Sequence, residues 1–170
     1  MAVSAKDQLA QMARYHVWAT DRLLTSIAPI PNEFYHKPCG LFFRSIHGTL
    51  NHLLLTDSEI WYPRFTQGRT ATLPLDAEME SNRTALASRL IAATARWPEY
   101  IASLDEEALA DDLRYTMTTG QMRTLPMSGA LLHVFNHATH HRGQITAALS
   151  MLGFAYQPLD LPFLIFSEHA

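Results

Sequence analysis

The stretch from about Ser128 to Gly153 constrains the fold of this chain most, because it has the pattern of one long amphipathic helix. Ser128 is a residue type that favours a helix start, and Gly153 is a type that favours a helix end. Four apolar side chains cluster within a few tens of degrees when the chain advances by about 100° per residue. These are Met127, Val134, Ile145 and Leu152. The pattern predicts a helix over about 128–153 with one buried face.

The same helix carries four of the nine histidines of the chain. His137 and His141, four residues apart, stand one turn apart on one face and can reach a single divalent metal. They lie about 70° and about 30° from the apolar centre, whereas His133 and His140 lie about 110° and about 130° away. An inward-facing imidazole needs a partner, because an unsatisfied buried polar group is costly. The partner is a metal, a carboxylate or a backbone carbonyl, and spacing alone leaves these alternatives open.

Apolar residues at helical spacing predict three earlier helices, at about 4–28, 42–65 and 76–104. Ser4 and Asp7 form a capping box at the start of the first helix. The second is expected to end or kink near Pro63, and the third to bend or end near Pro98, because proline removes a helical hydrogen bond.

The segments between the helices complete the predicted fold. Residues 29–41 contain three prolines and a glycine, which is typical of a crossover loop. Before the last helix, apolar and polar residues alternate from Leu113 to Thr118 and Thr119-Gly120 follows, which predicts a short β-hairpin or an extended loop. The proline-broken apolar tail is expected to pack along the bundle. We therefore predict one all-α domain over residues 1–170, a four-helix bundle with one long crossover and a short β-hairpin between the third and fourth helices.

Composition excludes several classes of protein. The net charge is −3 and no long basic run occurs, so nucleic-acid binding is not expected. Cys39 is the single cysteine, which excludes an internal disulfide and a cysteine-based zinc site. No apolar window approaches the length of a membrane span, and the start of the chain lacks the pattern of a signal peptide. We expect a cytoplasmic protein that interacts with neither a membrane nor a nucleic acid.

A third metal ligand must come from the second helix, where His47 and His52 compete. The two diverge by about 140° and cannot serve one ion together. The helical angle slightly favours His47 for the core, whereas His52 lies on a polar stripe that includes Glu59. Glu59 is a candidate fourth ligand or supporting carboxylate, with a solvated surface acid as the alternative. Asp57 lies about 140° from His52 and is not expected to reach the same ion.

Two sequence segments resemble a known family. SIHGTLNHLLLTDSEIW and the later HVFNHATHHRGQI are similar to the DinB family of metal-binding four-helix proteins, also called DinB/YfiT-like, and YHVWATDRLL resembles its first helix. In that family a histidine of the NHLL-like segment and two of the NHxxxHRGQ-like segment hold the metal. Position by position, the resemblance implies His52, His137 and His141 as ligands, and it favours His52 over His47.

The resemblance implies a metal-dependent enzyme acting on a small molecule, either a thiol-linked transferase or a hydrolase. A non-catalytic metal-binding or stress-response protein is the alternative. The metal is expected to be zinc or nickel, with iron and manganese as further candidates, and a low-molecular-weight thiol is a candidate cofactor. Three neutral imidazoles leave the ion its full charge, which would lower the pKa of a water or a thiol. The pattern assigns no catalytic or cofactor-binding residue.

Three smaller expectations concern packing. Gly143 is expected to allow close helix packing, and Arg142 to pair with an acid elsewhere in the chain. Apolar residues of the first helix and the tail exceed what one small core needs, so a homodimer is expected.

Overall fold

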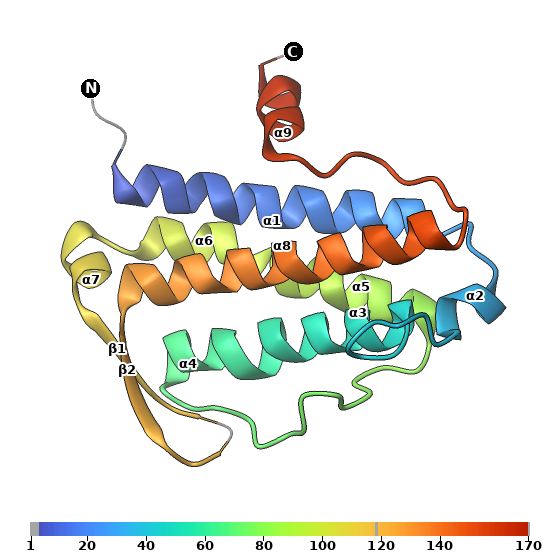
Figure 1. Ribbon diagram of the computed structural model, residues 1–170. Coiled ribbons are helices and arrows are strands. Elements are labelled where there is room, and N and C mark those ends of the chain that lie inside the picture. The colour runs from blue at the N-terminus through green and yellow to red at the C-terminus, as the bar shows by residue number, and fades with distance from the viewer. Residues whose placement is uncertain (1–3, 118, 170) are drawn as a thin grey trace.

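Four helical rods lie side by side in the computed structural model, which describes residues 4–117 and 119–169 (Figure 1). The rods, in chain order, are α1 (Ala5–Ile27), α3–η1–α4 (Ile46–Leu55, Thr56–Trp61 and Tyr62–Gln67), α5–α6 (Arg83–Thr94 and Arg96–Ser103) and α8 (Met127–Met151). Both α1 and α3 contact α5 and α8, so the rods form a ring with α1 diagonally opposite α3. The expected four-helix bundle is confirmed.

The start of α1 follows the predicted capping box. The backbone N–H of Asp7 donates to Ser4 Oγ at 3.1 Å, and the backbone N–H of Ser4 donates to Asp7 Oδ2 at 3.1 Å. This exchange satisfies two helix-end donors that would otherwise lack a partner.

The second rod begins at Ile46 and not near Phe42, because residues 41–45 form a tight turn. Arg44 adopts a φ of 72°, and Ser45 caps the helix by accepting from the Gly48 N–H at 3.1 Å. The rod then passes through Pro63 without ending. The π-helical segment η1 directly precedes Pro63 and keeps the rod continuous. Pro63 itself lies in the first turn of α4, where a missing backbone N–H costs little.

The third rod begins at Arg83, so the expected start near Asp76 is wrong. Asn82 supplies the cap by accepting from the Ala85 N–H at 3.0 Å, and residues 69–82 form a long loop. The expected break near Pro98 is present as the interruption between α5 and α6. A proline ring clashes with the carbonyl four residues earlier, which here belongs to Thr94, the last residue of α5.

The expected hairpin is present. Strands β1 (Asp112–Thr116) and β2 (Met122–Pro126) pair antiparallel. Leu113 and Tyr115 are buried while Arg114 between them is exposed, as the alternation predicts. Thr118, which belongs to the predicted alternation, lies outside the described residues.

The fourth helix differs from expectation at its start. It begins at Met127, so Ser128 is not its cap, whereas Gly153 follows its end with a φ of 79°. Gly143 is exposed, and a Cβ there would meet no atom within 4 Å. The expectation that Gly143 allows close helix packing is therefore wrong.

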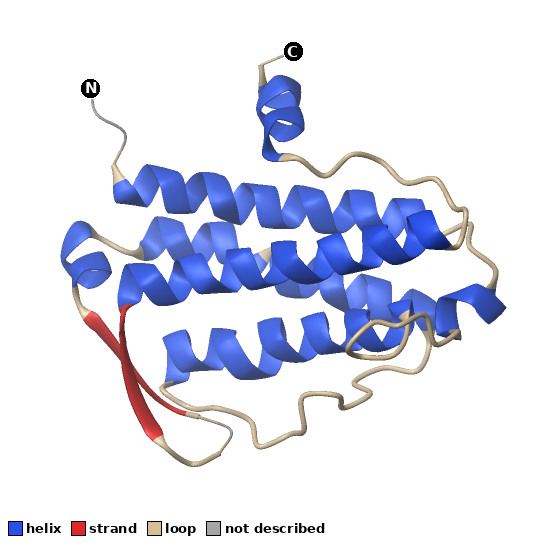
Figure 2. Ribbon diagram, viewed as in Figure 1, coloured by secondary structure: helices blue, strands red, loops and turns tan. Residues whose placement is uncertain are grey.

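In the part of the chain that the structure describes, three short helices lie outside the rods: α2 (Asn32–His36), α7 (Glu106–Ala110) and α9 (Leu161–Glu168). The crossover expected to be loop throughout thus contains α2. The tail runs beside the bundle without regular structure up to Asp160, and α9 then projects beyond α1 (Figure 2). Across the described ranges, none of the helices combines the length and hydropathy that a transmembrane span requires.

Candidate metal centre

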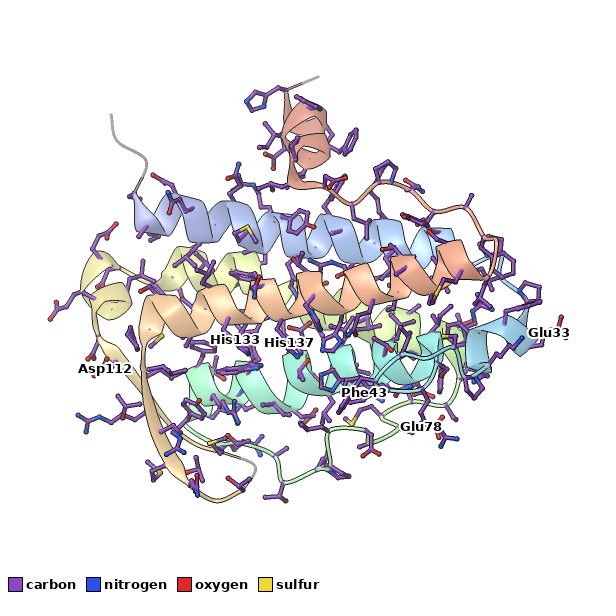
Figure 3. All side chains as sticks on the ribbon, viewed as in Figure 1. Glu33, Phe43, Glu78, Asp112, His133 and His137 are labelled. Atoms are coloured by element: carbon purple, nitrogen blue, oxygen red, sulfur yellow. The ribbon has the colours of Figure 1, made fainter. Side chains whose placement is uncertain are left out.

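The structure brings three histidines together from two facing helices. His52 comes from α3, and His137 and His141 come from α8. His137 Nε2 lies 3.2 Å from His52 Nε2 and 3.1 Å from His141 Nε2. One ring nitrogen from each residue lies within 4.8 Å of the other two. Figure 3 shows His133 and His137 on the side of α8 that faces the second rod, with Phe43 close by.

Hydrogen bonds at the far side of two rings fix which nitrogen faces the centre. His52 Nδ1 lies 2.8 Å from the carbonyl oxygen of Leu75, and His141 Nδ1 lies 2.8 Å from Gln144 Oε1. Both partners are acceptors, so each Nδ1 carries the proton and each Nε2 keeps its lone pair. Two lone pairs therefore point at a common position, as in metal sites whose histidines are oriented by outer hydrogen bonds.

Burial keeps the three imidazoles neutral. It lowers the pKa of His52 to about 4 and that of His137 to about 3, and the neighbouring histidines lower the pKa of His137 further. Burial also lowers the pKa of His141. Neutral imidazole is the form that binds metals.

His47 is buried, as the helical angle favoured, but it lies apart from this cluster. Its Nε2 lies 2.7 Å from Glu78 Oε1, where the long loop passes α3. The loop is held there by Asn51, whose side chain bonds both the N–H and the carbonyl of Glu80. The other two histidines of α8, His133 and His140, are exposed, in line with their angles.

The sequence patterns did not identify Phe43, which lies against the cluster. Its ring stacks on the His52 ring at a centroid distance of 3.8 Å and an angle of 17°. The turn that places it depends on Gly48, because a Cβ there would collide with the Phe43 carbonyl oxygen. A glycine one turn after a phenylalanine, in the first turn of a helix, was the available signal.

The two acids of the second rod point away from the cluster. Glu59 is half-buried and lines a small cavity that the second rod shares with Arg89 and Arg96 of the third. Asp57 is buried and accepts from Trp97 Nε1 at 2.9 Å, and His16 Nε2 lies 3.0 Å from its other oxygen. Among the described residues the candidate metal group therefore contains three histidines and no carboxylate.

Asp57 belongs to a buried network beside the cluster. Arg142 Nη1 donates to His16 Nδ1 at 2.9 Å, which leaves the proton of neutral His16 on Nε2, facing Asp57. Burial acts to raise the pKa of Asp57, but His16, Trp97 and the charge of Arg142 hold it below its usual value. The acid partner expected for Arg142 is thus Asp57, and His16 lies between the two and bonds to both. The helical pattern did not identify His16 or Trp97, because their partners lie far away in sequence.

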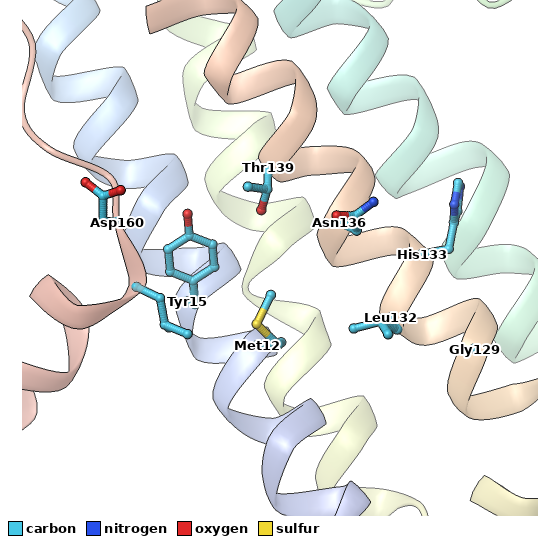
Figure 4. Close-up of a pocket in the computed structure, with 9 residues that line it drawn as sticks. Met12, Tyr15, Gly129, Leu132, His133, Asn136, Thr139 and Asp160 are labelled. Atoms are coloured by element: carbon cyan, nitrogen blue, oxygen red, sulfur yellow. The ribbon is translucent and has the colours of Figure 1, made fainter.

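A cavity of about 600 Å³ lies elsewhere (Figure 4). It is bounded by α1, α8 and the tail, and none of the three clustered histidines is among its described lining residues. The histidine cluster is therefore separate from this cavity. The converging nitrogens define the candidate metal site, because a metal needs ligands at fixed distances and not a large volume.

The fold and the site define a class of protein: a four-helix bundle whose facing helices bring together side chains that commonly hold a metal. A family model described as the DinB family matches residues 1–169, and the chain belongs to that family.

Individual relatives agree with this assignment. The chain is 29% identical to Protein DinB of Bacillus subtilis (strain 168) over 164 residues, which covers 92% of each chain. YfiT from Bacillus subtilis, described as a probable metal-dependent hydrolase with an unusual four-helix bundle topology, has a TM-score of 0.64 at 16% identity, with 88% of this chain and 89% of YfiT covered. A DinB-like protein from Bacillus cereus has a TM-score of 0.59 at 16% identity, with 83% and 90% covered. At this identity the structural likeness establishes the fold.

Proposed function

We propose that His52, His137 and His141 bind one divalent metal ion through Nε2, and that the protein is a metal-dependent hydrolase of a small molecule. The observation that carries the proposal is the pair of outer hydrogen bonds, from His52 to Leu75 and from His141 to Gln144, which commit both Nδ1 protons. Without an ion, the facing lone pairs of His52 and His141 would compete for a single proton on His137.

The donor set fits zinc or nickel, and iron or manganese less well, because neutral imidazoles suit the later metals of the series. Three protein ligands leave at least one position for water or substrate, which is typical of catalytic centres. When bound, the ion would supply Lewis acidity that lowers the pKa of a water or a thiol. Phe43 stacks on the ring of His52, and Leu75 and Gln144 hold two rings in orientation. The description of YfiT supports hydrolysis for this chain by analogy.

A thiol-linked transferase is the second candidate, and one observation favours it. Asp57 and Glu59, the acids of η1, are turned towards other partners, so neither is placed as a general base for water. A thiol loses its proton without a general base more readily than water does, because the ordinary pKa of a thiol is far below that of water.

Reconstitution tests both candidates. The protein is stripped with a chelator, reloaded with one equivalent of zinc or nickel, and assayed on small esters and amides, and on electrophiles with added thiols. We expect activity to return with the metal, to be lost in His137→Ala and to survive in His140→Ala. A folded, fully loaded protein that is inactive in both assays would contradict an enzyme and favour a non-catalytic metal-binding protein.

A homodimer is a separate proposal. Helix α9 is apolar, and Phe163 and Phe166 are 42% and 66% exposed. It stands beside the large cavity between α1 and α8, so a second copy could cover both. Sedimentation at micromolar concentration should give the dimer mass, and a monomer would contradict the proposal.

A further inference from the structure

Arg64 of α4 is a buried cation without a carboxylate partner in the described part of the chain. The residue is 6% exposed, and no Asp or Glu oxygen among residues 4–117 and 119–169 forms an ion pair with it. The other buried arginine, Arg142, is balanced by Asp57 through His16. A buried charge without a counter-ion is costly, and burial lowers the pKa of Arg64. The position therefore needs an explanation beyond stability.

Three elements hold the Arg64 guanidinium in place. Its central carbon lies 4.4 Å from the ring centroid of Trp61 and 4.3 Å from that of Tyr115 on β1. Its Nε donates to Thr70 Oγ1 at 2.8 Å, and Thr70 in turn donates to the carbonyl of Thr116 at 2.5 Å. The group is thus fixed before any ligand arrives, which reduces the entropy lost on binding.

The Arg64 central carbon lies over two aromatic rings, and the terminal nitrogens have no hydrogen-bond partner among the described residues. Cation–π contacts use the faces, and within the described ranges Nε has the only hydrogen bond of this side chain. The two terminal nitrogens form the edge that binds a carboxylate with two parallel hydrogen bonds. This edge, which has no partner in the described part of the chain, is therefore available to an anion.

A row of rings joins Arg64 to the histidine cluster. The Trp61 ring lies 4.8 Å from the His133 ring, and the His133 ring lies 5.6 Å from the His137 ring, measured between centroids. His133 is exposed and His137 is half-buried, so solvent reaches the α8 end of this row, whereas Trp61 and Arg64 are buried at its other end. An extended small molecule lying along the rings would contact the cluster and the guanidinium together.

We propose that Arg64 recognises a carboxylate of the substrate, whose reactive group lies at the three-histidine centre. The substrate class is then an extended small organic acid, with Trp61 and His133 packing against its middle. This inference rests on the proposed metal centre and assigns to it a specificity residue that does not touch the metal.

Cobalt-loaded protein and a series of model thiols test the inference. The series pairs mercaptocarboxylic acids of increasing chain length with the mercaptoalcohols of the same length, and the sulfur-to-cobalt absorption band reports binding. We expect one chain length at which the acid binds about tenfold more tightly than the alcohol, because a hydrogen-bonded charge pair is worth that factor or more. Equal affinities at every length would overturn the role of Arg64. If the cobalt-loaded protein gives no absorption band with any thiol, the result would instead contradict the proposed function, which requires an open coordination position on the metal.

Arg64→Gln should abolish the preference for the acid and leave the affinity for the alcohol within about twofold. Arg96→Gln is the matched control, because Arg96 also lies over an aromatic ring, that of Tyr62 at 4.2 Å, but belongs to the third rod. A preference for the acid that survives in Arg64→Gln would contradict the assignment. Equal affinities of acid and alcohol in the unmodified protein would overturn the proposal even if Arg64→Gln does not fold.

Discussion

The Phe43 ring lies almost flat on the His52 ring, with 3.8 Å between centroids. His52 is also bonded through Nδ1 to the carbonyl of Leu75, so its ring is fixed by one contact on its face and another at its edge. A loop before α3 and a loop after α4 thus both orient this histidine.

Phe43→Ala should lower metal affinity about tenfold, because residues that orient a ligand typically contribute a factor of that size. Competition against a chromophoric chelator measures the affinity. Phe42→Ala is the matched control, since Phe42 is the adjacent residue and is 80% exposed. Equal affinities in the two variants would contradict an orienting role for Phe43.

Gln144 offers a second test of ligand orientation. Gln144→Ala removes the acceptor of the His141 Nδ1 proton and should weaken metal binding by about tenfold or more. Gln144→Glu keeps an acceptor and makes it anionic, so affinity should be retained or increased. Unchanged affinity in Gln144→Ala would show that His141 does not depend on this bond.

The buried network should contribute to stability and not to metal binding. Asp57→Asn leaves the charge of Arg142 without its counter-ion and should lower the free energy of unfolding by about 3–5 kcal/mol. Glu59→Gln, two residues away on η1, should change it by about 0.5 kcal/mol or less. Urea unfolding measures both. Similar small effects in the two variants would contradict the role of the network.

Much of this architecture was predictable from sequence, because four helices with periodic apolar faces leave few alternatives to a bundle. The start of the third rod was not predictable from the sequence. Asp76 and Asn82 are both residue types that cap helices well, and tertiary contacts of the loop decide between them. The histidine pair of α8 follows from helical spacing. The choice of His52 over His47 came from the resemblance, because the decisive contact, between His47 and Glu78, links α3 to a loop of irregular structure. The positions of Phe43 and Arg64 also depend on contacts with irregular loops, which a helical pattern does not predict.

The metal-free protein should become less stable as the pH falls below about 6.5. Unfolded histidines titrate near that value, whereas burial holds the folded pKa of His52 at about 4 and that of His137 at about 3. Between these limits the unfolded state binds more protons, so stability is complete above about 6.5 and declines towards pH 4. Urea midpoints at several pH values measure the slope, and His137→Gln should reduce it. A flat profile in the unmodified, metal-free protein would contradict the burial argument.

Metal stoichiometry in two histidine variants tests the central claim most directly. His52→Ala and His47→Ala change buried histidines of the same helix, only five residues apart. After chelation, reloading and removal of free ion, elemental analysis should find one metal per chain in the unmodified protein and in His47→Ala, and none in folded His52→Ala. One metal per chain in His52→Ala, with loss in His47→Ala, would contradict the assignment.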